Sequence, residues 1–72
     1  MVQFIVRPSS QMRFPQAFRL KDVLDGTVAD YLYSLCNSWE IAIEGSSWCE
    51  LATIGSEFEC EDFVIEVEGD EE

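Results

Sequence analysis

The stretch "EFECEDFVIEVE", residues 57–68, combines strand-like alternation with a change of phase, and it decides the fold class that the rest of the chain must join. Two of its apolar side chains, Phe58 and Cys60, occupy even positions, whereas three later ones occupy odd positions: Phe63, Ile65 and Val67. Because successive side chains of a strand point to opposite faces, one regular strand cannot bury both sets. We therefore expect a bulge or a short turn at residues 61–62 and a last strand over residues 63–68.

The N-terminal segment carries a second strand signal. Residues 2–7, "VQFIVR", are dominated by β-branched and aromatic residues, and Pro8 is expected to end the ladder. Residues 11–20 leave open whether a return strand follows, because Pro15 interrupts the pattern. In such a strand four apolar side chains would face inward: Met12, Phe14, Phe18 and Leu20.

Residues 25–38, "DGTVADYLYSLCNS", predict a helix. Thr27 is the expected N-cap, and Asp30 in the first turn lies at the favourable end of the helix dipole. Apolar residues then recur at helical spacing and form one stripe: Val28, Tyr31, Leu32 and Leu35. Asn37 and Ser38 are expected to end the helix.

The chain after residue 38 changes to a period of two. "WEIAIEG" and "WCELATI" predict two strands of a hairpin, joined through the "GSS" of residues 45–47. The expected fold is therefore α+β: one domain over residues 1–68, with one main helix packed on a four- to five-stranded, mostly antiparallel sheet. Residues 69–72 are expected to fray as an acidic C-terminus.

Charge is strongly segregated along this 72-residue chain. All four basic residues fall within the first 21 positions, all fifteen acidic residues follow, and the formal net charge is −11. Such a surface should repel nucleic acid and anionic lipid and attract basic proteins, so neither direct nucleic-acid nor membrane binding is expected. The sequence has no segment apolar enough to span a bilayer, which predicts a cytoplasmic protein whose three cysteines are reduced core residues: Cys36, Cys49 and Cys60.

The expected sheet would have one face covered by the helix and one open to solvent. Five carboxylates would share the open face: Glu40, Glu44, Glu50, Glu66 and Glu68. Their separations, roughly 6.8 Å along a strand and about 4.8 Å between strands, are of the same order as the spacing of phosphates in a nucleic-acid backbone. Trp48 is expected either beside Glu50 as an anchor for a partner or in the core.

In length, acidity and lack of histidine the whole chain resembles small inhibitors carried by bacteriophages and mobile elements: anti-CRISPR proteins, anti-restriction proteins and inhibitors of uracil-DNA glycosylase. This resemblance implies an inhibitor in the bacterial host cytoplasm that blocks the nucleic-acid channel of a host nuclease, an RNA-guided effector complex or a polymerase. Its oligomeric state stays open between a monomer and a weak dimer, because an edge strand at residues 63–68 could pair with a copy of itself although its charge opposes this. Further carboxylates would then join the phosphate-like set: Glu57, Glu59, Glu61 and Asp62.

Two alternatives remain open on the sequence. If residues 11–20 form a strand, the element order resembles the β-grasp fold of ubiquitin-like proteins and sulfur carriers, and "DGTVADYLYSL" resembles the start of their helix, although no Gly-Gly ends this chain. An adaptor or an antitoxin that neutralises a basic partner would share the charge pattern. The absence of histidine argues against an enzyme, and no motif predicts a cofactor or metal site.

Overall fold

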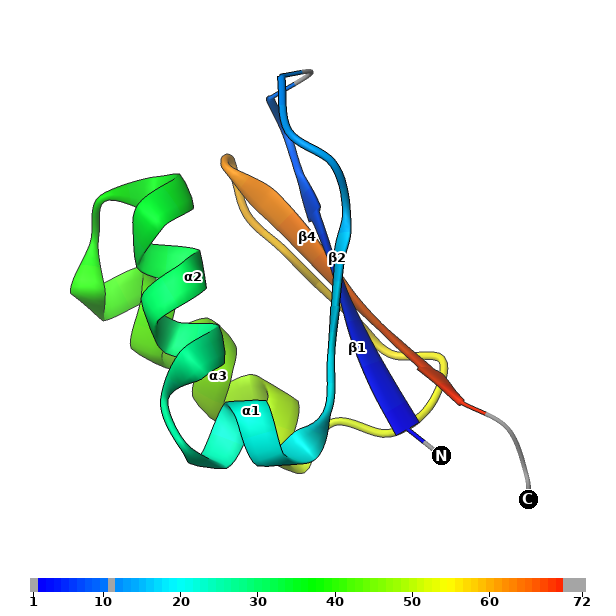
Figure 1. Ribbon diagram of the computed structural model, residues 1–72. Coiled ribbons are helices and arrows are strands. Elements are labelled where there is room, and N and C mark those ends of the chain that lie inside the picture. The colour runs from blue at the N-terminus through cyan, green and yellow to red at the C-terminus, as the bar shows by residue number, and fades with distance from the viewer. Residues whose placement is uncertain (1, 11, 70–72) are drawn as a thin grey trace.

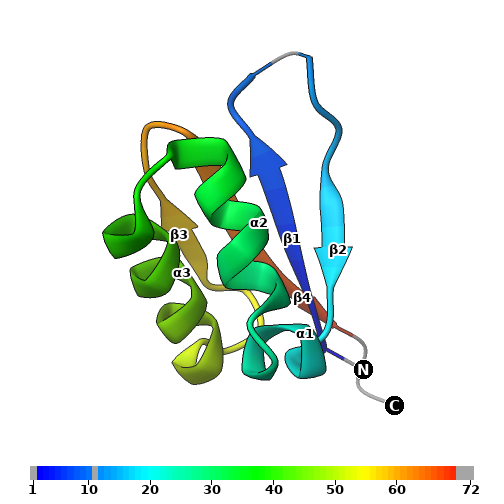
Figure 2. The same ribbon diagram turned by 60° about the vertical axis from the view of Figure 1, so that its left-hand side comes forward.

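The computed structural model describes residues 2–10 and 12–69 and has the α+β architecture expected (Figure 1). Its elements are β1 (Val2–Pro8), β2 (Gln16–Phe18), α1 (Leu20–Leu24), α2 (Thr27–Cys36), α3 (Trp39–Leu51), β3 (Glu57–Glu59) and β4 (Phe63–Gly69). The strands form one antiparallel sheet in the order β2-β1-β4-β3. The three helices gather on one side of this sheet (Figures 1 and 2). The α+β class is as expected, but the element order differs: three helices follow β2 in place of one, and the second and third occupy the region up to Leu51 where the sequence predicted one helix and a hairpin.

The core lies between the helices and the two central strands. Phe63 and Ile65 of β4 are fully buried, and Ile65 pairs with Val6 of β1. The expected change of phase before β4 is confirmed, because residues 60–62 form a turn in which the Cys60 N–H donates to the Phe63 carbonyl at 3.0 Å. β4 ends at Gly69, one residue beyond the expected end, and residues 70–72 lie outside the described part of the chain.

Residues 39–51 form the helix α3, so the hairpin expected there is wrong. The side chain of Ser38 caps this helix by accepting the Ile41 N–H at 3.3 Å. The buried positions are small residues at helical spacing: Ala42, Gly45, Ser46 and Cys49. Larger apolar residues alternate in this segment as in a strand, but the segment is helical, because a helix with these small residues on one side can pack closely on α2 and the sheet.

The helix α2 is confirmed, with Val28 and Leu32 fully buried. Its N-cap is Gly26 in the left-handed region (φ 91°), and Thr27, the expected cap, is the first helical residue. Its C-cap, Asn37, is also left-handed (φ 54°) and donates its N–H to the Tyr33 carbonyl at 2.8 Å. An asparagine tolerates this conformation better than most residues, and it lets the chain turn directly into α3.

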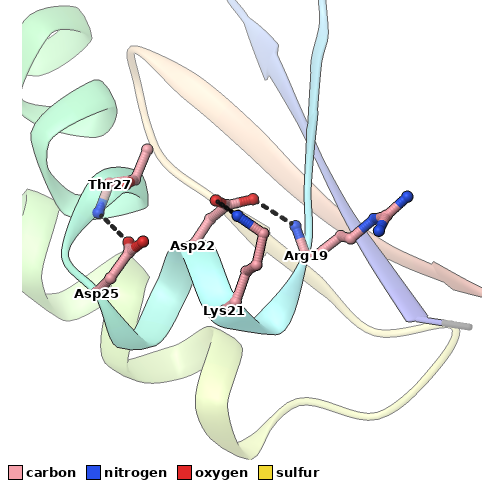
Figure 3. Close-up of polar contacts among 5 residues, drawn as sticks. All are labelled: Arg19, Lys21, Asp22, Asp25 and Thr27. Atoms are coloured by element: carbon pink, nitrogen blue, oxygen red, sulfur yellow. Dashed lines mark hydrogen bonds and ion pairs between the residues drawn. The ribbon is translucent and has the colours of Figure 1, made fainter.

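The short helix α1 was not expected from the sequence. Asp22 holds its start by accepting the Arg19 N–H at 3.0 Å and lies 3.4 Å from the Lys21 ammonium group (Figure 3). At its end the Asp25 carboxylate accepts the Thr27 N–H at 3.0 Å, which joins α1 to α2. The two local hydrogen bonds accepted by Asp22 and Asp25 therefore stabilise α1, a helix with only one buried residue, Val23.

The return strand that the sequence left open is present but short. In β2 only Phe18 is half-buried, with its ring centroid 5.3 Å from that of Tyr31. The inward orientation expected for Met12, Phe14 and Leu20 is wrong, since Met12 and Phe14 are 90% and 84% exposed. The reason is that the loop between β1 and β2 projects past the helices, where no core lies beneath it (Figures 1 and 2).

Candidate acidic interface

The open face of the sheet, opposite the helices, carries four carboxylates on its two C-terminal strands. We call this set the acidic sheet face: Glu57, Glu59, Glu66 and Glu68. Glu57 pairs directly with Glu66 across the strands, so the two side chains project on the same side. The placement follows from alternation, because Phe58, Ile65 and Val67 between these residues point toward the helices. Four of the ten residues expected at a binding site therefore lie on this face, in one row that runs from Glu59 through the Glu57–Glu66 pair to Glu68.

One cation lies on the same face. Arg7 of β1 forms an ion pair with Glu66, and the hydrogen bond and charge of Glu66 raise the pKa of the guanidinium group. Four carboxylates and one guanidinium leave a net formal charge of −3 on this face. Ile5 and Val64 lie between the charged groups and are half-buried, so the surface offers apolar contact as well as negative charge.

The remaining predicted sheet carboxylates do not belong to this face. Glu40, Glu44 and Glu50 are exposed on α3, which packs against the covered side of the sheet. The single ladder of carboxylates expected from the sequence is therefore wrong, and the molecule has two separate acidic surfaces. The error follows directly from the mistaken hairpin, because alternation along a strand places side chains differently from the 100° rotation per residue of a helix.

Trp48 also departs from the expected exposed position beside Glu50. Its side chain is half-buried, and its ring centroid lies 5.6 Å from that of Phe58. Phe58 in turn lies 6.1 Å from Phe63, so Trp48 extends the aromatic part of the core. The core role, which the sequence left as an alternative, is the one that the contacts support.

Glu61 and Asp62 occupy the turn between β3 and β4, at one end of the acidic sheet face. Glu61 is exposed, whereas Asp62 is half-buried and its backbone carbonyl accepts the Ser9 N–H at 3.0 Å. This bond ties the turn to the end of β1. The two acidic residues thus lie next to the acidic sheet face, in the turn, and are not part of its strands.

The buried thiol of Cys49 offers little reactive chemistry, whereas Cys36 and Cys60 are half-buried. Burial raises the pKa of the Cys49 thiol to about 12, with a smaller contribution from Glu50. In the part of the chain that the structure describes, no three His, Cys, Asp or Glu side chains gather closely enough to hold a metal ion. No helix within residues 2–10 and 12–69 is long and apolar enough to cross a membrane.

The sequence reading missed the apolar part of the exposed side of α3. Trp39, Ile43 and Leu51 are 48%, 55% and 87% exposed, and they lie among the three carboxylates of this helix. The signal that would have located them is Ser38, a good N-cap, followed by small residues at helical spacing. Comparison of the chain with protein-family models, with curated proteins and with solved structures finds no significant match.

Proposed function

We propose that this protein is a non-catalytic inhibitor that binds a basic nucleic-acid-binding protein, such as a host nuclease or an RNA-guided defence complex, through its acidic sheet face. The observation that supports this proposal is the register of β3 and β4, which pairs Glu57 with Glu66 on the open face. Glu59, the next outward residue of β3, and Glu68, the next outward residue of β4, extend the negative charge in opposite directions from this pair. The carboxylates would occupy the place of phosphates on the partner.

The spacing supports this role. Outward side chains lie roughly 6.8 Å apart along a strand and about 4.8 Å apart between strands, so a row of Lys and Arg arranged for a phosphate backbone meets several carboxylates together. Like charges directly opposite one another destabilise a sheet. A positive partner surface relieves this repulsion, and the net charge of −11 accelerates its approach at low salt.

The proposal is tested with two variants of equal charge change. Glu57→Gln, Glu59→Gln and Glu68→Gln together remove three charges from the acidic sheet face while leaving the Arg7–Glu66 ion pair intact. Glu40→Gln, Glu44→Gln and Glu50→Gln remove three charges from α3 as the matched control. Each tagged protein is used to capture proteins from bacterial lysate at two salt concentrations, with and without excess duplex DNA.

The unmodified protein is expected to retain a basic nucleic-acid enzyme that duplex DNA displaces. The sheet variant should lose most of this partner, whereas the α3 variant should retain more of it at equal net charge. The proposal fails if DNA leaves the captured partner in place, or if the sheet variant captures as much of it as the unmodified protein.

A further inference from the structure

The exposed side of α3 has the composition of a docking surface. We call this set the α3 outer face: Trp39, Glu40, Ile43, Glu44, Ser47, Glu50 and Leu51. At 100° per residue, Trp39 and Ile43 lie within about 40° of one another around the helix, with Glu50 in the same sector. Glu40 and Glu44 form a second row beside them. The face therefore has an apolar row at one end, flanked by carboxylates.

Trp39 is held in place by α2. Its ring is stacked on that of Tyr33, with 4.4 Å between centroids and 9° between planes. About half of the Trp39 side chain is still exposed, so the stack presents a rigid aromatic surface without covering it. Pre-ordered aromatic residues of this kind contribute strongly to protein interfaces because little side-chain entropy remains to be lost.

The charges select the chemistry of the partner. Every charged side chain of the α3 outer face is a glutamate, and the sequence contains no Lys, Arg or His after Lys21. A partner that covers Trp39 and Ile43 must therefore place positive charge beside Glu40, Glu44 and Glu50. A helix is the partner shape that fits, because the thirteen residues of α3 offer a straight ridge of about 20 Å.

We propose that the α3 outer face binds a basic amphipathic helix, whose apolar stripe covers Trp39 and Ile43 and whose Lys or Arg residues pair with the three glutamates. This inference rests on the proposed function in one respect, that the partner is basic. It assigns a second contact surface, on the side of the molecule opposite the acidic sheet face. The helix is therefore a separate ligand from the protein bound by the acidic sheet face, so the variant with Glu40→Gln, Glu44→Gln and Glu50→Gln should lose peptide binding and still retain the partner of the sheet face.

A second copy of the chain is the competing occupant. The loop between β1 and β2 exposes Met12 and Phe14 on either side of Arg13. This loop therefore also combines apolar side chains with a positive charge. Self-association through this loop would, however, bring together two molecules that each carry a net charge of −11. Charge complementarity therefore favours a separate basic partner.

The probe for the test is a synthetic helical peptide of about 18 residues with leucines at positions i, i+3, i+4 and i+7 and lysines elsewhere. A scrambled peptide of identical composition keeps the charge and removes the apolar stripe. Binding is followed by titration of ¹⁵N-labelled full-length protein in NMR. We expect the amphipathic peptide to bind about tenfold more tightly than the scrambled one and to shift the amide signals of α3.

Two variants locate the site. Ile43→Ser should weaken binding of the amphipathic peptide about tenfold, whereas Leu24→Ser, which removes an exposed leucine from α1, should leave it unchanged. The sheet variant with Gln at positions 57, 59 and 68 should keep the α3 amide shifts. If this variant fails in lysate capture while peptide binding persists, the proposed function is supported independently of the α3 site.

Three outcomes would overturn the inference. Equal affinity for the two peptides would mean that charge alone governs binding, and amide shifts confined to β3 and β4 would place the peptide on the sheet. Concentration-dependent dimers in sedimentation analysis that disappear in Phe14→Ser would identify a second copy as the occupant. Lysate capture through the sheet face would survive each of these results, so loss of the α3 site and loss of the proposed function are distinguishable.

Discussion

Gly45 lies on the buried side of α3, against α2 and the sheet, and replacing it tests the packing of the helical layer. A Cβ atom at this position would lie 2.9 Å from Cδ1 of Leu32 on α2 and 3.4 Å from Cδ1 of Ile65 on β4. Carbon atoms in favourable contact are roughly 3.5–4.0 Å apart. Leu32 and Ile65 are both fully buried, so a shift of either methyl group must be accommodated by the packed core around it.

Two opposing effects set the size of the change in Gly45→Ala. Alanine in a helix interior is favoured over glycine by about 1 kcal/mol, whereas an extra methyl group in a packed core costs about 1–3 kcal/mol. The free energy of unfolding should therefore fall by about 1 kcal/mol. Gly45→Val places two further methyl groups against the same neighbours and should cost about 3 kcal/mol, out of about 4–11 kcal/mol for a domain of this size.

The assay is urea unfolding followed by circular dichroism, with constant m-values as the check that only stability has changed. Leu32→Val removes the Cδ1 atom that the new methyl group would meet. In this background Gly45→Ala should raise the free energy of unfolding by up to about 1 kcal/mol, because only the helix propensity remains. Ser47→Ala, on the exposed side of α3, is the control and should raise it by about 0.5 kcal/mol.

The reasoning is refuted if Gly45→Ala stabilises the unmodified protein by as much as it stabilises the Leu32→Val variant. Such additivity would mean that residues 45 and 32 do not compete for the same space. It would also remove the physical reason for a glycine on the buried side of α3.

Three further outcomes are expected. Ser38→Ala should lower the free energy of unfolding by about 1 kcal/mol in urea titrations, since the α3 N-cap bond to the Ile41 N–H is lost, and an unchanged midpoint would count against this cap. Iodoacetamide at pH 8 should modify Cys36 and Cys60 of the folded protein well before Cys49, because burial and a pKa of about 12 leave almost no Cys49 thiolate. The rates are measured by mass spectrometry of digests, and equal rates at all three cysteines would contradict this expectation. The hydrogen bond from Thr27 holds the pKa of Asp25 below its ordinary value of 3.8, so its contribution to stability is complete above that value and is lost as the pH falls through the lower folded-state pKa. An NMR titration that places the Asp25 pKa at or above 3.8 would contradict this bond.

Strands β1 and β4 were predictable because their signals are local. β-branched and aromatic residues dominate β1, where Phe4 and Val6 form the buried side, and β4 buries alternate residues with the opposite phase from β3. The acidic sheet face follows from that alternation once the strands are correctly identified. The same reasoning placed α2, where Val28 and Leu32 recur at helical spacing.

The region from Trp39 to Leu51 was not predictable in the same way. Its large apolar residues alternate as in a strand, yet the structure exposes several of them and buries Ala42, Gly45, Ser46 and Cys49. Side-chain size misleads here, because close packing of one helix on another favours small residues at the contact. As a result, three predicted site residues lie on α3 and not on the open face of the sheet: Glu40, Glu44 and Glu50.

The sequence by itself determined the α+β class, the negative charge, its segregation along the chain and the outward carboxylates of the last strands. These properties depend on composition and on periods of two or 3.6 residues, which act within a few neighbouring positions. Only the tertiary structure decided that residues 39–51 are helical, that Trp48 belongs to the core and that the acidic residues form two surfaces. The physical reason is that the small-residue side of α3 is favourable only when α2 and the sheet are present to fill the space beside Gly45, and those contacts join residues far apart in the chain.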